Sequence, residues 1–108
     1  MANPSTPQAQ KIAVANNAGL MVAFTVHFTG SDGKEGFSPK TDHFAFAQSA
    51  TVDMAKLSGV KPGVKMKPLI APVASSEKEG PEVEFAENGL TATYTVTGTA
   101  FAYEVALL

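Results

Sequence analysis

Two histidines, His27 and His43, are the side chains best suited to metal binding or to proton transfer near neutral pH. Asp42 or Asp53 would be the natural partner in a metal site. The two histidines do not stand at a spacing that metal sites use, and the sequence has no cysteine to act as a thiolate ligand. We therefore expect both histidines to be ordinary surface residues and the protein to hold no metal or other cofactor.

Several serines, the two histidines and the aspartates are the residue types of a hydrolytic triad. No Gly-X-Ser-X-Gly motif, which presents a nucleophilic serine on a sharp turn, occurs in the sequence. Glu82 and Glu84 form a carboxylate pair, but their strand spacing points both to one face, where we expect them to be solvated. The sequence therefore predicts a protein that is not an enzyme.

The segment 30–36, Gly-Ser-Asp-Gly-Lys-Glu-Gly, has the composition of a ligand-binding loop. Asp32 and Glu35 offer too few oxygens for calcium, and Phe37-Ser38-Pro39 prevents the helix that a phosphate-binding loop requires. A flexible hairpin loop is the interpretation that remains. Phe37 is a large apolar residue beside glycines, so it is either an exposed contact residue or a lid over the end of the domain.

Two charged segments and one threonine-rich strand complete the candidate contact surface. Lys65 and Lys67 belong to a lysine-rich segment, and Glu82 and Glu84 to a glutamate-rich one. The two segments either pair within one sheet or dock between two copies of the chain. Threonines at alternate positions place their hydroxyls on one strand face; they are Thr91, Thr93, Thr95 and Thr97.

The threonine face suits either solvent or sugar hydroxyls, since threonine is also a common strand residue. A sugar site normally includes an exposed aromatic ring for stacking. The chain has no tryptophan, and the alternation predicts that Tyr94 and Tyr103 point inward. Carbohydrate binding is therefore the alternative function rather than the first one.

In the segments that must position these residues, apolar side chains recur at every second position, which indicates strands. In the segment 20–28, apolar residues at even positions alternate with smaller or more polar ones. The same alternation predicts strands around 12–14, 44–54 and 64–70. At Gln48-Ser49 we expect either a bulge or a corner where the chain changes sheets, and Pro68 and Pro72 predict that 64–70 is an edge strand. Six phenylalanines are expected to point inward: Phe24, Phe28, Phe44, Phe46, Phe85 and Phe101.

Residues 82–108 predict a three-stranded antiparallel meander. Asn88-Gly89 is a strong signal for a two-residue hairpin loop, which would place Phe85 opposite Ala92. Gly98-Thr99 predicts a second loop of this kind, with Tyr94 opposite Tyr103. Both registers put the apolar residues on one face of the meander.

Seven or eight short strands predict an all-β fold, a single antiparallel β-sandwich over residues 11–108, with a small β-barrel as the alternative. In length and alternation the chain resembles immunoglobulin-like and fibronectin-like sandwiches in general architecture. The segment Asn16-Asn17-Ala18-Gly19 after the first strand resembles small aegerolysin-like sandwiches. Residues 1–10 are polar, with two prolines, and predict an N-terminal arm that lies on its own domain or on a neighbouring copy.

The composition bounds the function. The chain has 108 residues, 44% of them hydrophobic, and a net charge of −2; all eight basic residues are lysine. The length predicts one folded domain, and the slightly negative net charge predicts no nucleic-acid partner. No apolar run suits a membrane span. Without a leader-like start the default location is cytoplasmic, while export without a leader, or after its removal, stays open. We expect a structural or interaction module that self-associates as a homo-oligomer through its arm and charged surface, or binds another protein; the alternative is a lectin-like module that binds a glycan.

Overall fold

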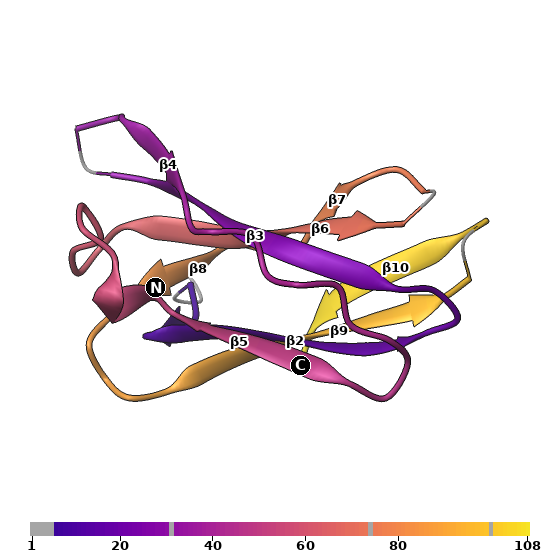
Figure 1. Cartoon of the computed structure of the whole chain (residues 1–108). Coiled ribbons are helices and arrows are strands. Elements are labelled where there is room, and N and C mark those ends of the chain that lie inside the picture. Colours follow the sequence, from indigo (N-terminus) through magenta and orange to yellow (C-terminus); the bar gives the residue numbers. More distant parts are fainter. Residues whose placement is uncertain (1–5, 31, 74, 100) are drawn as a thin grey trace, which may run out of the picture.

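The protein folds into two β-sheets that stack face to face (Figure 1). A computed structural model describes residues 6–30, 32–73, 75–99 and 101–108. Sheet A has the strand order β1-β8-β6-β3-β4, with β7 also paired to β6, and sheet B has the order β10-β9-β2-β5. The bounds are β1 Gln8–Ala9, β2 Lys11–Ala18, β3 Val22–Thr29, β4 Glu35–Phe37, β5 Ser49–Asp53, η1 Met54–Lys56, β6 Lys65–Pro72, β7 Lys78–Glu79, β8 Val83–Phe85, β9 Thr91–Gly98 and β10 Tyr103–Leu107.

The predicted all-β sandwich is confirmed, but its pairing is mixed rather than purely antiparallel. β1 runs parallel to β8, and β2 runs parallel to β9 over all eight of its residues. A parallel pair needs a long crossover connection. Here that connection is most of the chain, because β2 leads directly into β3 of the other sheet and β9 returns to sheet B much later.

The core lies between the two sheets and follows the predicted alternation. Val22, Phe24 and Val26 of β3 are fully buried, as is Tyr94 of β9. Tyr103 is also buried, so both tyrosines point inward as expected. These side chains form one continuous apolar cluster with residues of every long strand, and its burial supplies the main stabilising free energy of the domain.

Two of the six phenylalanines expected in the core are exposed. Phe46 lies in the turn before β5, where Ala47 adopts a positive φ of 68°, and this turn interrupts the alternation. Phe101 lies in the loop between β9 and β10 and is fully exposed. Both predictions were wrong because side chains alternate between inward and outward only as far as the strand itself continues.

The predicted meander over residues 82–108 is half correct. β8 belongs to sheet A and β9 to sheet B, so Phe85 does not pair with Ala92 and the Asn88-Gly89 turn passes from one sheet to the other. β9 and β10 do form a hairpin, but Tyr103 lies opposite Gly98 rather than Tyr94. The register is displaced by an even number of residues, which leaves the side chains within β9 and β10 on their predicted faces.

β6 is an interior strand, contrary to the prediction from its prolines. It lies between β3 and β8 in sheet A. Pro68 stands between the residues that pair with β8 and those that pair with β7. Its carbonyl accepts a hydrogen bond from Gly80 N (2.9 Å) on that side, and the proline nitrogen faces the same edge. The missing N–H of Pro68 therefore falls in the gap between the short strands β7 and β8, where no backbone hydrogen bond to β6 is lost.

Candidate functional site

The described part of the N-terminal arm is a strand of the chain's own domain. Pro7 O accepts a hydrogen bond from Glu84 N (2.8 Å), and Ala9 O accepts one from Ala86 N (3.0 Å). Ala9 is buried under this pairing. Residues 6–10 thus make their hydrogen bonds within the chain, and residues 1–5 of the predicted arm lie outside the described residues.

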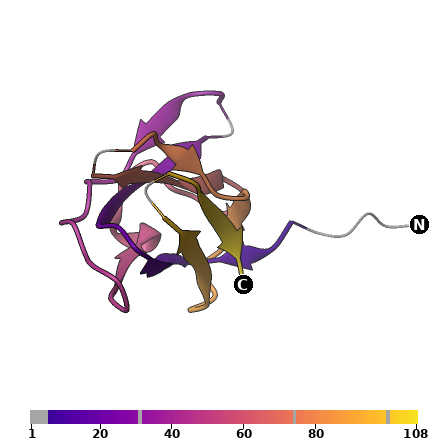
Figure 2. The ribbon, with the colours of Figure 1, turned by 90° about the vertical axis from the view of Figure 1, so that its right-hand side faces the viewer.

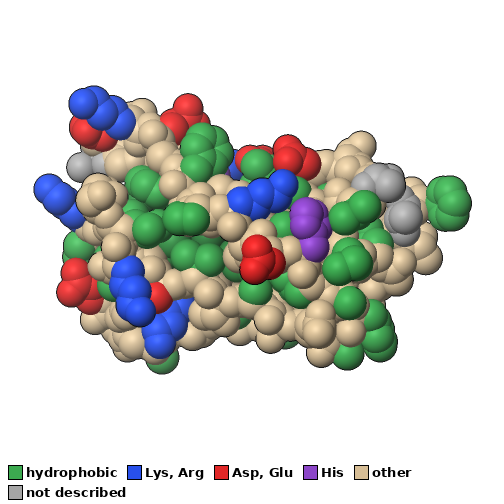
Figure 3. Space-filling model, in the orientation of Figure 1, with side chains coloured by type: hydrophobic (Ala, Val, Ile, Leu, Met, Phe, Trp, Pro, Cys, Tyr) green, Lys and Arg blue, Asp and Glu red, His purple; other side chains and the backbone are tan. Residues whose placement is uncertain are grey.

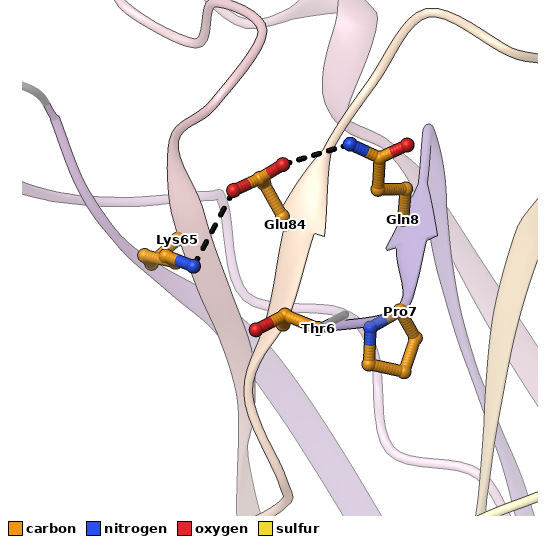
Figure 4. Close-up of a pocket in the computed structure, with 5 residues that line it drawn as sticks. All are labelled: Thr6, Pro7, Gln8, Lys65 and Glu84. Atoms are coloured by element: carbon orange, nitrogen blue, oxygen red, sulfur yellow. Dashed lines mark hydrogen bonds and ion pairs between the residues drawn. The ribbon is translucent and has the colours of Figure 1, made fainter. Parts of the chain in front are cut away.

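The pairing of Lys65 with Glu84, predicted for neighbouring strands of one sheet, is present. The Nζ of Lys65 lies 3.3 Å from a carboxylate oxygen of Glu84, and Gln8 Nε2 donates to the other oxygen at 2.8 Å. These three residues line an open polar pocket of about 490 Å³ together with Thr6 and Pro7 (Figure 4). The carboxylate is already held by two donors of its own chain, so this part of the charged surface offers little to a second copy.

The remaining charged residues of the predicted contact surface are arranged differently. Lys67 forms its ion pair with Glu79 of β7, at 3.2 Å, rather than with a residue of β8. Glu82 lies in the exposed stretch before β8. The lysine-rich and glutamate-rich segments therefore meet within the chain, which is the intramolecular alternative of the two predicted arrangements.

The hydrogen bond from Gln8, followed by that from Lys65, holds the pKa of Glu84 below its ordinary value of 4.5. A lowered carboxylate pKa contributes stability above the unfolded-state pKa, and that contribution is lost as the pH falls through the folded-state pKa. Replacing Gln8 by alanine should raise the pKa of Glu84 toward 4.5, as measured by NMR titration of the carboxyl carbons. Thr6→Ala is the control, because Thr6 lines the same pocket. Equal Glu84 pKa values in the wild type and Gln8→Ala would contradict the assignment.

Phe37 is an exposed residue of the edge strand β4. Its ring stacks on the imidazole of His27, with centroids 4.9 Å apart and planes at 30°. His27 Nε2 lies 2.7 Å from Glu35 Oε1. The loop that precedes Phe37 is thus the end of a β3–β4 hairpin, and the phenylalanine covers a histidine rather than the end of the domain.

The threonines of β9 lie on the outer face of sheet B, as predicted. Across the sheet, Thr93 and Thr95 stand beside Ala13 and Ala15 of β2. Thr91 and Thr97 are exposed, and Thr93 and Thr95 are partly exposed. No large aromatic residue stands next to them in the paired strands, so carbohydrate binding stays a prediction.

The histidines are not brought together with acids in a metal-binding cluster. Within the described ranges, no group of three or more His, Asp or Glu side chains could hold a metal ion. His43 is exposed in the segment before Phe44. Across the same ranges, no helix has the length and apolar character to cross a membrane.

A different surface gathers exposed apolar side chains at one end of the sandwich. We call it the loop end and define it as residues 18–21, 45–48, 72–73 with 75–76, and 98–99 with 101–102. Each loop carries one large exposed apolar residue: Met21 (47%), Phe46 (64%), Val73 (52%) and Phe101 (100%). The four loops lie together at the right-hand end of Figure 1, and Figure 2 looks directly onto this end.

Backbone hydrogen bonds join three of the loops directly and the fourth through β2. Gly19 N donates to Gly98 O (3.0 Å), and Val73 N donates to Met21 O (3.0 Å). Ala47 N donates to the carbonyl of Asn16 at the end of β2 (2.7 Å). The apolar side chains therefore project from a connected support and not from independent loops.

The loop end as defined here contains no charged residue, and Glu77 and Lys78 at the start of β7 border it. The sequence has no charged residue in 18–21, 45–48, 72–76 or 98–102. The loops at the opposite end, 30–34, 57–63 and 86–90, each contain at least one. In Figure 3 the right-hand end accordingly shows hydrophobic side chains without lysine, aspartate or glutamate.

Comparison with known proteins gives structural likeness alone. No family model and no curated protein matches the chain. Among solved structures it is similar to the cytotoxin protein suilysin from Streptococcus suis (TM-score 0.49, 11% identity, 92% of this chain and 23% of that one). It is also similar to the human-specific toxin intermedilysin (0.49, 12%, 91% and 22%) and to listeriolysin O (0.47, 9%, 91% and 22%). The chain spans less than a quarter of the length of these proteins, and we carry no function over from them.

The loop end was not predicted from the sequence. The signal that could have found it is the apolar content of four turns, which normally carry polar residues. Leu20-Met21 follows Gly19, and Phe46 and Phe101 are each flanked by alanines. Recognising these as one surface requires the topology, because nothing local says which turns share an end of the sandwich.

Proposed function

We propose that the protein is a non-enzymatic contact module that docks by its loop end on the surface of an electrically neutral lipid bilayer. The observation that supports this most strongly is the gathering of Met21, Phe46, Val73 and Phe101 at one uncharged end of the domain. Monomeric proteins seldom expose several large apolar residues together without a partner. The contact surface of this proposal replaces the arm and the charged strands expected from the sequence.

The residue types at the loop end favour a lipid surface over a protein partner. Apolar side chains gain free energy when they leave water for the acyl region, and that gain requires no specific geometry. The surrounding polar residues, among them Gln48, Ser76 and Thr99, are uncharged and suit the headgroup layer. Because the loop end has no lysine, the proposal specifies neutral rather than anionic lipids.

The first test uses vesicles of phosphatidylcholine and the full chain in a flotation assay. The wild type should float with the vesicles, and Phe101→Ser should lower its affinity by roughly thirtyfold, which corresponds to about 2 kcal/mol for one large apolar side chain. Since Phe101 makes no buried contact, the substitution should leave the stability of the fold unchanged. Binding should also be insensitive to salt.

Phe37→Ser is the matched control, because Phe37 is exposed to a similar degree as Phe46 but lies on β4, away from the loop end. It should bind vesicles like the wild type. Failure of the wild type to float, or equal losses in Phe37→Ser and Phe101→Ser, would contradict the proposal. Self-association that Phe101→Ser abolishes, in a protein that ignores vesicles, would identify a second copy as the partner instead.

A further inference from the structure

A groove along β5 combines positive charge with an apolar wall, far from the loop end. It has a volume of about 560 Å³, within the usual range for small-molecule sites. β5 ends the strand order of sheet B, so one of its edges pairs with no described strand. The segment 39–41 faces this edge and is fixed to sheet A by Thr41 N, which donates to Phe24 O (3.0 Å). The groove therefore lies where the edges of the two sheets meet.

Three lysines from three different elements line the groove: Lys11 at the start of β2, Lys40 in the segment after β4, and Lys56 in η1. None of them forms an ion pair with a described residue, whereas Lys65 and Lys67 are both paired with glutamates. Figure 3 shows lysine side chains gathered over the η1 end of β5. The groove thus concentrates positive charge in a chain whose net charge is −2, although Lys11 and Lys56 lie near enough to Asp53 to stabilise its carboxylate.

Asp53 is the single acid of the groove, and it is already engaged. Its Oδ1 accepts hydrogen bonds from Ala55 N (3.0 Å) and from Gln10 Nε2 (3.2 Å). One aspartate against three lysines leaves an excess of two positive charges. An anion that enters the groove would meet an attractive field that the protein itself does not cancel.

The other lining groups are hydroxyls and apolar side chains. Thr41 Oγ1 accepts a hydrogen bond from Phe24 N (3.0 Å), so its own hydrogen is directed elsewhere and can be donated to a ligand. Thr51 is exposed on β5. Pro39, Val52 and Leu57 supply an apolar wall beside these donors.

We propose that this groove binds a small organic phosphate monoester. A monoester carries close to two negative charges and several acceptor oxygens, which matches the charge excess and the donors of the groove. Lysine binds phosphate as a mobile point charge, and three ammonium groups around one cavity can share the oxygens. The apolar wall holds the organic part of the ligand. The site is separate from the proposed lipid contact.

Phenyl phosphate is the probe, and its binding is followed by amide chemical shifts of the full chain. The largest shifts should fall on Lys11, Thr41 and the segment 51–57. Lys56→Gln and Lys40→Gln should each weaken binding about fivefold, because each removes one of three charged donors. Inorganic phosphate should shift the same amides more weakly, since it leaves the apolar wall empty.

Lys34→Gln is the matched control, because it removes the same charge from an exposed lysine of the β3–β4 hairpin. It should bind phenyl phosphate like the wild type. Shifts spread over every lysine of the surface, or equal weakening in Lys34→Gln and Lys56→Gln, would overturn the proposal. Phe101→Ser should bind phenyl phosphate normally, so failure of the lipid proposal and failure of this one remain distinguishable.

Discussion

Replacing Asn16 by alanine should lower the free energy of unfolding by about 3 kcal/mol, because three backbone groups at the core lose a hydrogen bond and Phe44 O alone keeps another, from Val22 N. The side chain of Asn16 is fully buried between the sheets. Its Nδ2 donates to Leu20 O (2.7 Å) and to Phe44 O (3.0 Å), and its Oδ1 accepts from Ala18 N (2.9 Å). Alanine makes none of these three hydrogen bonds and leaves a small cavity in addition.

Asn17→Ala is the matched control for this prediction. Asn17 is the next residue of β2, but it is exposed and its Nδ2 makes one hydrogen bond, to Thr95 Oγ1 (2.9 Å). Its replacement should cost less than about 1 kcal/mol. Urea denaturation followed by circular dichroism measures both values. A loss in Asn16→Ala no greater than in Asn17→Ala would mean that the buried amide is not what joins these loops.

The same substitution should loosen the loop end before it unfolds the domain. Asn16 connects the turn at Leu20 with the residue before the turn at Ala45–Gln48, and both turns carry exposed apolar residues. Val22 and Phe44 exchange two backbone hydrogen bonds beside it, at 3.1 and 2.8 Å. In Asn16→Ala, hydrogen exchange should accelerate at these two amides more than at the amides of β9.

The sequence was sufficient to predict which face of each strand is buried. Alternation identified Val22, Phe24 and Val26 as core residues, and it placed both tyrosines inward. It could not predict which strands pair, because the inner faces of two stacked sheets look onto the same core. Phe85 and Ala92 are both buried whether β8 and β9 share a sheet or oppose one another, so the consistent pattern around Asn88-Gly89 did not distinguish the two arrangements.

The same distinction, between strand faces and strand pairing, separates the candidate surfaces that could be predicted from those that could not. The Lys65–Glu84 pair could be predicted only as one of two arrangements, because the sequence gives the strand faces, whereas the pairing of β6 with β8 comes from the structure. The loop end and the lysine groove each combine residues from several elements that the topology alone brings together. Lys11 and Lys40 lie far apart in the sequence, and their shared groove exists because β5 and the segment 39–41 form facing edges of different sheets.

Replacing Gly98 by alanine should destabilise the domain by about 4 kcal/mol, a large part of the stability of a chain of this size. Gly98 has a φ of +109°, which L-residues rarely adopt, and this conformation alone costs about 1–3 kcal/mol. A Cβ atom there would lie 2.3 Å from Ala102 O and 2.9 Å from Tyr103 Cα. Both are backbone atoms, so no side-chain rotation can relieve the clash.

Gly89→Ala separates the two contributions. Gly89 also has a positive φ, of +73°, but a Cβ atom built on it meets nothing within 4 Å. Gly89→Ala should therefore lower the free energy of unfolding only by the cost of the left-handed backbone conformation, about 1 kcal/mol. Equal losses at Gly98 and Gly89 in urea denaturation would show that the β9–β10 loop yields to the added methyl group.

The larger expected loss at Gly98 has a functional counterpart, because its carbonyl accepts the hydrogen bond from Gly19 N that joins the loops carrying Met21 and Phe101. A chain that shifts Gly98 to admit a side chain must give up that junction, so vesicle binding should fall in Gly98→Ala even at temperatures where the protein remains folded, and should be retained in Gly89→Ala.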